Sequence, residues 1–215
     1  TVTISSDVVP AWQPLAGLTS WWRGDGNAQD ALGANHGTLQ NGAAFAPGKF
    51  GEAFSFDGVD DQIVVPPNAN LNAGTGITIA AWVNPSSMGH GRPIAQTRTS
   101  GNVGGYTFET TDSPFGPGSA LQWIIWINGQ TVILQTEANV LQLGVWRHVA
   151  ATYDGASMKI FVDGTQRASL SIAGAVADSA EPFVIGRNVV IPSFAWHGLL
   201  DEVEVYQRPL SAAEI

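Results

Sequence analysis

Short runs in which apolar residues alternate with polar or small ones make up most of the chain, and turn dipeptides separate them. Asparagine–glycine or aspartate–glycine pairs stand at 41–42, 57–58, 128–129, 154–155 and 163–164, and such pairs favour tight turns with positive φ. The runs rich in β-branched and aromatic residues are 54–56, 62–65, 76–83, 121–127, 131–134, 146–153, 157–162, 183–186 and 199–206. This pattern predicts roughly twelve strands in an all-β, antiparallel sandwich.

Helical stripes are lacking, apart from a short turn expected at 209–215. With no long linker and no internal repeat, the pattern predicts a single domain over residues 1–215. Residues 1–14 are expected to form a linker or an edge strand.

The final run, 199–206, contains the most informative carboxylate. Its alternation places two sets of side chains on opposite faces: Leu200, Glu202 and Glu204 on one, and Leu199, Asp201, Val203 and Val205 on the other. A carboxylate on an otherwise apolar face needs a partner. Asp201 is therefore expected either to bind a metal ion or to accept hydrogen bonds from backbone amides of the N-terminal loop.

Composition and charge exclude several classes of protein. Charged residues make up only 13% of the chain and hydrophobic residues 44%, which is the opposite of a disordered segment. The formal net charge of −9 and the scattered arginines argue against nucleic-acid binding. No run is long and apolar enough for membrane insertion, no signal peptide is visible, and there is no cysteine for disulfides or thiolate metal sites. We expect a mature or excised domain.

Four segments, 17–39, 51–61, 146–164 and 198–215, together resemble the laminin-G-like, concanavalin A-like jelly rolls of large bacterial secreted proteins. The resemblance implies two curved sheets and a secreted or cell-surface location. It also implies a structural calcium ion where the N-terminal loop meets the last strand. The matching positions are Asp25, Asn27, Asp30, Asn35 and Asp201, whose oxygen atoms suit calcium.

A second acidic segment, 57–61, contains Asp57, Asp60 and Asp61. It lacks the ligand spacing and the terminal glutamate of a helix–loop–helix calcium site. The resemblance implies mainly a hairpin turn there, with a metal role as the minor alternative.

The aromatic residues divide between core and surface. The resemblance places Trp22, Trp82 and Trp146 in the core. Trp123 and Trp126 are three residues apart on one strand and must point to opposite faces, so one of them faces away from the sheet contact.

An exposed aromatic ring with polar neighbours is a platform for a sugar. The candidate ligand-binding residues are Trp123, Trp126, Tyr106, Arg92, His90, Trp196 and Arg187, with Arg98, Asp112 and Asn128 as further companions. The alternative is that the aromatic residues only fill the sandwich.

Taken with the resemblance, these residues favour a non-catalytic, lectin-like module that binds a polysaccharide or glycan and carries structural calcium, within a larger secreted protein. The alternative is a protein-interaction or structural module without a glycan site. A glycosidase or lyase is less favoured. Glu202 and Glu204 have a spacing similar to that of a glycosidase pair, but the resemblance places them in the calcium-linked last strand, where we expect them on a solvated face.

Overall fold

The computed structural model describes residues 14–98, 104–113 and 116–215, and the side chains of these residues except 112, 113 and 116–119. The prediction for the first fourteen residues lies outside this part, apart from Pro14. The described residues form fifteen strands and one short 3-10 helix, η1 (Ala69–Leu71). No helix among them is long and apolar enough to cross a bilayer.

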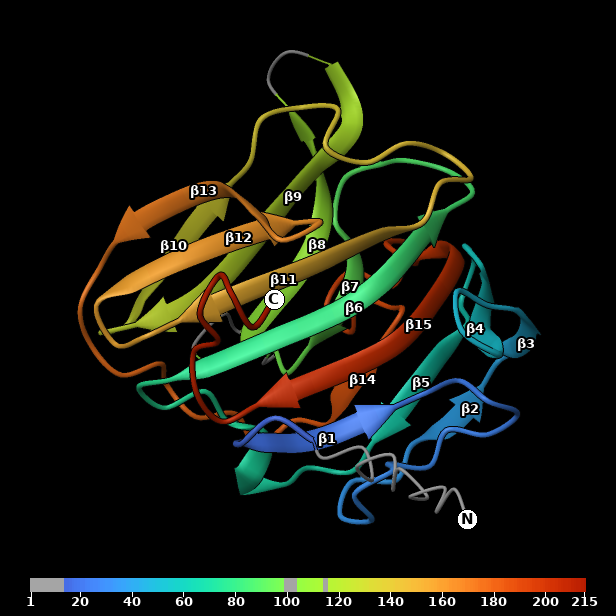
Figure 1. The fold of residues 1–215 in the computed structure, drawn as a ribbon, viewed down its shortest axis with the longest axis horizontal. Helices are drawn as coiled ribbons and strands as arrows, with labels where there is room; N and C mark the ends of the chain where they lie inside the picture. Colours follow the sequence, from blue (N-terminus) through green and yellow to red (C-terminus); the bar gives the residue numbers. More distant parts are fainter. Residues whose placement is uncertain (1–13, 99–103, 114–115) are drawn as a thin grey trace, which may run out of the picture.

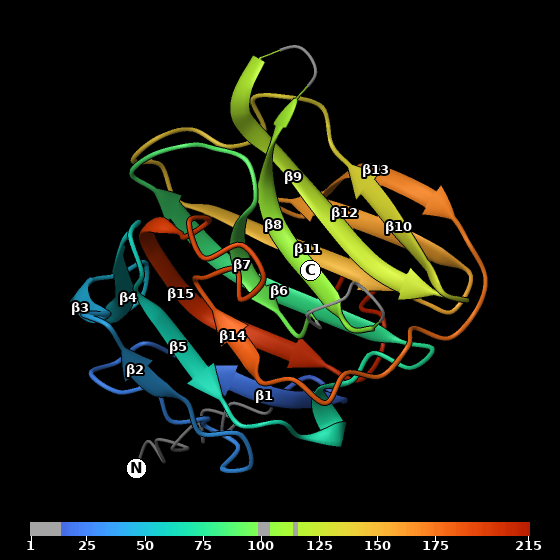
Figure 2. The same ribbon diagram turned by 180° about the vertical axis from the view of Figure 1, so that it is seen from behind.

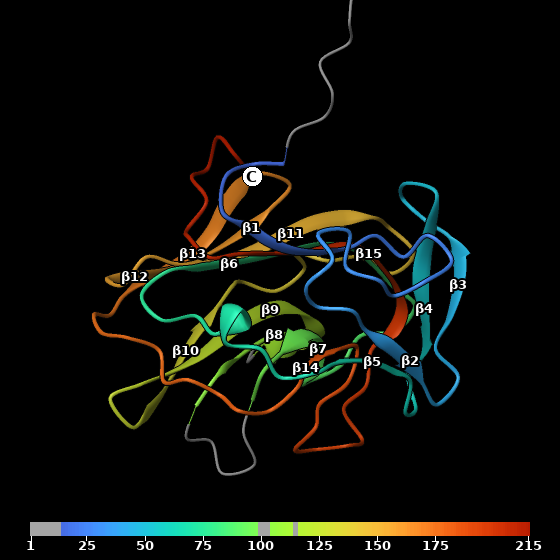
Figure 3. The same ribbon diagram turned by 90° about the horizontal axis from the view of Figure 1, so that it is seen from below.

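The strands form two antiparallel sheets that lie face to face, as Figures 1 and 3 show. The eight-stranded sheet runs in the order β13 (Thr165–Ser171), β12 (Ser157–Val162), β11 (Arg147–Tyr153), β6 (Ile77–Pro85), β15 (His197–Tyr206), β4 (Glu52–Asp57) and β3 (Ala44–Pro47), and β1 (Leu18–Trp22) also pairs with β15. The seven-stranded sheet runs in the order β10 (Gln130–Gln135), β9 (Gly116–Ile127), β8 (Tyr106–Ser113), β7 (Arg92–Gln96), β14 (Phe183–Ile185), β5 (Gln62–Val65) and β2 (Thr38–Gln40). The predicted all-β sandwich is confirmed.

Aromatic side chains from both sheets fill the space between them. Trp22 of β1 stacks on Phe183 of β14, with ring centroids 4.9 Å apart. Trp123 packs against Tyr106 at 5.4 Å and against the edge of Phe108 at 6.1 Å. All five side chains are at most 1% exposed, so burial of these large rings is a main source of stability.

Three aromatic residues predicted to bind a ligand belong to this core instead. Tyr106 and Trp123 are 0% exposed, and Trp196 is 1% exposed within the same cluster. The Tyr106 hydroxyl donates to the Leu71 carbonyl at 2.8 Å, which satisfies it inside the sandwich. None of the three presents a ring face to solvent, so none can serve as a sugar platform.

The prediction that Trp82 and Trp146 lie in the core was also wrong. Trp22 lies in the core, but Trp82 and Trp146 are only half-buried. Trp82 lies on the outer face of the eight-stranded sheet, where its ring centroid is 5.4 Å from that of His148 and 4.4 Å from the Lys49 ammonium nitrogen.

A β-bulge changes the alternation that the sequence predicts for β15. The register to β6 shifts between Asp201 and Glu204, and Glu202 has a φ of +50°. Leu200 therefore points into the core with Val203 and Val205, while Leu199 does not. The bulge also divides β15 along one edge, so that residues 197–200 pair with β4 and residues 203–206 pair with β1.

Replacing Trp123 by alanine should remove about 3–5 kcal/mol from the free energy of unfolding, because it leaves a large cavity between the sheets. Denaturant unfolding followed by far-UV circular dichroism measures this change. The matched control, Leu170→Ala at a position that is 38% exposed, should change the free energy by less than about 1 kcal/mol. Equal effects of the two changes would contradict the placement of Trp123.

Candidate functional site

A cavity of about 230 Å³ opens on the outer face of the seven-stranded sheet, the face that Figure 2 turns toward the viewer. Its floor comes from alternate residues of two paired strands, Glu109 of β8 with Gln122, Ile124 and Trp126 of β9. The residues between them, such as Trp123, point into the core. Because side chains alternate along a strand, packing of the inner face fixes which side chains face the cavity.

The floor is polar and buried at its centre. Glu109 is 3% exposed, and its Oε1 accepts a hydrogen bond from Nε2 of Gln122. Oε2 of Glu109 is also buried and has no hydrogen-bond partner among the described residues. Burial raises the pKa of the Glu109 carboxyl, whereas the Gln122 hydrogen bond and the charges of Arg98 and His90 lower it. An unpaired buried oxygen of this kind calls for a donor from water or a ligand.

One wall of the cavity combines a cation with an aromatic ring. Trp126 is 1% exposed, and the Arg98 guanidinium carbon lies 5.6 Å from its ring centroid. The indole Nε1 of Trp126 is buried without a hydrogen-bond partner in the described part of the chain. Trp126 therefore faces away from the core, as predicted for one of the pair with Trp123, but it is not an exposed platform.

The opposite wall comes from two loops. His90 is exposed, its Nδ1 lies 2.9 Å from Oγ1 of Thr111, and its ring meets Phe194 edge to face at 5.5 Å. Phe194 is half-buried. Ile191 beside it is 38% exposed, and Ile133 of β10 is 52% exposed. The mouth of the cavity therefore exposes aliphatic side chains beside His90, and the centre of its floor carries the polar pair Glu109 and Gln122.

Two of the predicted arginines support this wall. Nη1 of Arg92 donates to the Ala195 carbonyl at 3.0 Å. Nη1 of Arg187 donates to the Asp60 carbonyl at 3.3 Å, and the Arg187 carbonyl accepts from Nε2 of Gln96 at 2.7 Å. Both arginines hold the segment 187–195, and neither lines the cavity.

Of the further companions, Arg98 lines the cavity. Asn128 lies in the turn between β9 and β10, where its φ is +53°, and the Asp112 side chain is outside the described part. The sequence analysis missed Glu109, Gln122 and Phe194. The sequence did contain a signal for Glu109, because its carboxylate stands among the aromatic and hydroxyl residues of 106–111 in β8.

Of the five residues predicted to hold calcium, Asp25, Asn27 and Asp30 line one cavity of about 280 Å³, whereas Asn35 and Asp201 do not line it. Asp30 is saturated, since its two carboxylate oxygens accept from the backbone amides of four residues: Trp21, Leu32, Ala34 and Asn35. The Asn35 side chain bonds Ser20, Asn68 and Asn70. Oδ1 of Asn27 accepts from the Gln29 amide at 2.9 Å. The four amides thus occupy the lone pairs of the Asp30 carboxylate, whereas Oδ1 of Asn35 accepts one hydrogen bond, from Nδ2 of Asn68.

Asp201 is held mainly by backbone amides. It is 0% exposed, and its Oδ2 accepts from the amides of Lys49 and Phe50 at 2.8 and 2.9 Å. Its partners belong to the β3–β4 turn rather than to the N-terminal loop that the sequence analysis expected. Asp25 forms an ion pair with Arg23 at 2.9 Å and accepts from the Glu52 amide at 3.1 Å. Neither residue joins a set of three metal-ligating side chains within the described residues.

The bulge residue Glu202 carries a strongly shifted carboxyl group. Its side chain is 13% exposed and accepts a hydrogen bond from the indole Nε1 of Trp21. Burial raises the pKa of Glu202 to about 7, and the charge of Asp201 adds to the rise, whereas the Trp21 hydrogen bond and Arg23 oppose it. The fold therefore holds this carboxyl partly protonated near neutral pH.

A known protein family and several solved structures are similar to this chain. A family profile described as the concanavalin A-like lectin/glucanases superfamily matches residues 57–215. Domain 4 of AbnA, a GH43 extracellular arabinanase from Geobacillus stearothermophilus solved in complex with arabinotriose, has a TM-score of 0.72 and 19% identity over 92% of this chain and 95% of that domain. No curated protein matches the chain in sequence.

Two toxin domains are also similar in structure. The binding domain of Paraclostridial Mosquitocidal Protein 1 gives a TM-score of 0.70 at 17% identity, over 86% of this chain and 47% of that one. The botulinum neurotoxin serotype D binding domain gives 0.70 at 15%, over 92% and 50%. The chain thus spans about half the length of these toxin domains. At these identities the likeness shows the fold.

Replacing Asp201 by alanine should cost about 2–4 kcal/mol in the free energy of unfolding, because it leaves two amides of the β3–β4 turn without an acceptor. Thermal and denaturant unfolding measure the loss. Asp25→Ala is the matched control, since Asp25 is half-exposed and its ion pair with Arg23 contributes about 1 kcal/mol or less. A wild-type stability for Asp201→Ala would contradict this placement.

The Glu202 carboxyl should make stability fall with rising pH. Its folded pKa of about 7 lies above its ordinary value of 4.5, so the folded protein binds more protons between these values, and stability is lost as pH rises through that window. Glu202→Gln should match the wild type near pH 4 and exceed it above pH 7 by on the order of 1 kcal/mol. Thermal melting of both proteins from pH 4 to 8 tests this, and a constant difference across the range would contradict it.

Proposed function

The chain belongs to the concanavalin A-like lectin/glucanase superfamily, and on that premise we propose that it is a non-catalytic carbohydrate-binding module. We place its sugar site in the cavity on the outer face of the seven-stranded sheet. The observation that carries the proposal is the unpaired, buried Oε2 of Glu109 at the floor of a cavity whose mouth exposes aliphatic side chains. Sugar sites combine apolar contact with a few fixed polar groups.

The polar groups of the cavity match the hydroxyls of a sugar. Glu109 supplies an acceptor, and Arg98 and His90 supply donors at the wall and rim. A hydroxyl that donates to Oε2 of Glu109 would pair an oxygen that no described residue pairs. The C–H face of the sugar would lie against Ile133 and Phe194 at the mouth, which replace the exposed tryptophan of the sequence-based hypothesis.

The lining of the cavity favours binding over hydrolysis. Glycosidases use two carboxyl groups, about 5–10 Å apart, on either side of the scissile bond. Among the described residues that line the cavity, Glu109 is the one carboxyl group. The described lining thus offers groups that can hold a sugar, and it contributes one carboxylate where the usual mechanism uses two.

The similar structures are consistent with this role. The arabinanase domain was solved with arabinotriose, and it belongs to an extracellular enzyme. We propose by analogy that this chain acts as an accessory or adhesion module of a secreted protein and recognises a polysaccharide or glycan.

A second candidate function is protein docking, and one observation favours it. Three aliphatic side chains, Ile133, Val189 and Ile191, are 38–52% exposed at or near the mouth of the cavity. An aliphatic rim of this kind also suits a protein surface. Sugar binding remains the main proposal because the polar floor has no role in such a contact.

A glycan-array screen followed by calorimetry tests the sugar site. We expect specific binding that falls about tenfold or more in Glu109→Gln, because a charge-assisted hydrogen bond is lost. Leu170→Ala on β13, outside the cavity, should bind as the wild type does. Far-UV spectra and melting curves of each variant exclude unfolding as the cause.

Two results would overturn the proposal. The first is a folded wild-type protein that binds no glycan on the array at millimolar concentration, and this result would favour the docking function. The second is glycan binding that Glu109→Gln and Ile133→Ala both leave unchanged, which would place the sugar elsewhere on the molecule.

A further inference from the structure

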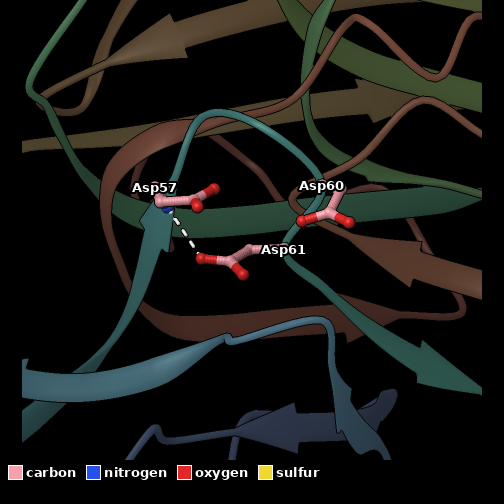
Figure 4. A group of neighbouring side chains, drawn as sticks. All are labelled: Asp57, Asp60 and Asp61. Atoms are coloured by element: carbon pink, nitrogen blue, oxygen red, sulfur yellow. Dashed lines mark hydrogen bonds between the residues drawn. The ribbon is translucent and has the colours of Figure 1, made fainter.

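Three carboxylates gather at the turn between β4 and β5, away from the residues predicted to hold calcium. Asp57 is the last residue of β4. Asp60 and Asp61 follow it in the turn, after Gly58 and Val59. Each of the three offers a carboxylate oxygen, and these oxygens all lie within 4.8 Å of one another. Figure 4 shows the Asp57 carboxylate next to that of Asp61, with Asp60 at the other end of the turn.

The Asp61 carboxylate is buried and only partly hydrogen-bonded. Asp61 is 3% exposed, and its Oδ2 accepts from the Asp57 amide at 2.8 Å. Its Oδ1 is buried and has no hydrogen-bond partner among the described residues. Gly42 lies beside that oxygen, since a Cβ at position 42 would come within 2.9 Å of it. A buried carboxylate oxygen without a donor is costly unless a cation or a donor fills the space.

The three carboxylates are like charges held close together, with oxygens within 4.8 Å of one another. Backbone amides reach two of them, since the Asp57 amide donates to Oδ2 of Asp61 and the Val59 amide donates to Oδ1 of Asp57, each at 2.8 Å. The nearby guanidinium of Arg187 donates to the Asp60 carbonyl rather than to any of the three carboxylates. A cation between the carboxylates would therefore relieve repulsion that the described residues leave in place.

We propose that the β4–β5 turn binds one divalent cation, with Asp57, Asp60 and Asp61 as its carboxylate ligands. Calcium fits the site best. Its ligand oxygens lie about 2.3–2.6 Å from the ion, so two of them can be up to about 5 Å apart, and the separation of 4.8 Å or less meets this limit. Magnesium requires a tighter and more regular octahedron, and the exposed Asp57 leaves room for water in the remaining positions.

The ion would also stiffen contacts that reach the cavity wall. The Asp60 carbonyl accepts from Nδ2 of Asn41 at 2.8 Å and from Nη1 of Arg187 at 3.3 Å. Asn188, the residue after Arg187, lines the cavity. A cation that fixes Asp60 would thus hold the β2–β3 turn and the start of the cavity wall in place. Its binding does not depend on whether the cavity takes a sugar.

Calcium titration of the whole chain, stripped with a chelator and free of sugar, tests the site. Calorimetry should show one calcium per chain, and the melting temperature should rise with calcium concentration. Asp60→Asn should weaken calcium binding about tenfold or more, and we expect it to fold because no described residue donates a hydrogen bond to the Asp60 side chain. Asp61→Asn should do the same, with melting curves to show that it folds.

Two control variants show whether a loss of calcium binding is specific to the β4–β5 turn. Asp178→Asn, an exposed aspartate away from the turn, should bind calcium as the wild type does. Asp25→Asn alters the calcium site that the sequence analysis predicted, and it should also leave calcium binding unchanged. Absence of calcium binding at millimolar concentration would overturn the proposal, and so would binding that is lost in Asp25→Asn but kept in a folded Asp60→Asn. Because no sugar is present, either result would leave the glycan proposal untouched.

Discussion

The packing of the two sheets fixes the direction of each described side chain in β8 and β9, and the rest of the molecule depends on it. Phe108 and Trp123 point inward because the core is made of large rings from both sheets. Alternation along a strand then forces Glu109 and Gln122 outward. Hydrophobic burial on one face thus places a carboxylate at the centre of the other, where the segment 187–195 covers it and leaves a cavity.

Much of the fold can be predicted from the sequence, because its signals are local. Turn dipeptides with positive φ mark the hairpins, and Asn41, Asn128 and Asp163 do have it. The bulge in β15 could not be predicted, because one extra residue reverses the alternation and nothing in 199–206 marks where it falls. Asp201 therefore seemed to face the core, whereas it lies opposite Trp82 on the outer face and accepts from the β3–β4 turn.

The candidate site was predictable only in part, because its walls come from distant segments. Spacing showed that Trp123 and Trp126 face opposite ways, but two identical residues do not reveal which one is inside. Trp196 lies in a loop, and its burial depends on how that loop folds over the sandwich. Arg92 and Arg187 were chosen for their chemistry, yet they hold the loop rather than line the cavity. Such long-range packing leaves no periodic trace in the sequence.

Counting donors on each carboxylate separates structural aspartates from candidate cation ligands. Asp30 accepts from four backbone amides and has no lone pair to give, although its loop composition suggested calcium. Asp201 and Asp61 each keep one buried, unpaired oxygen. Only Asp61, within the described residues, has two further carboxylates close enough to share an ion. Oxygen-rich composition alone thus does not identify a cation ligand, because backbone amides compete with cations for the same lone pairs.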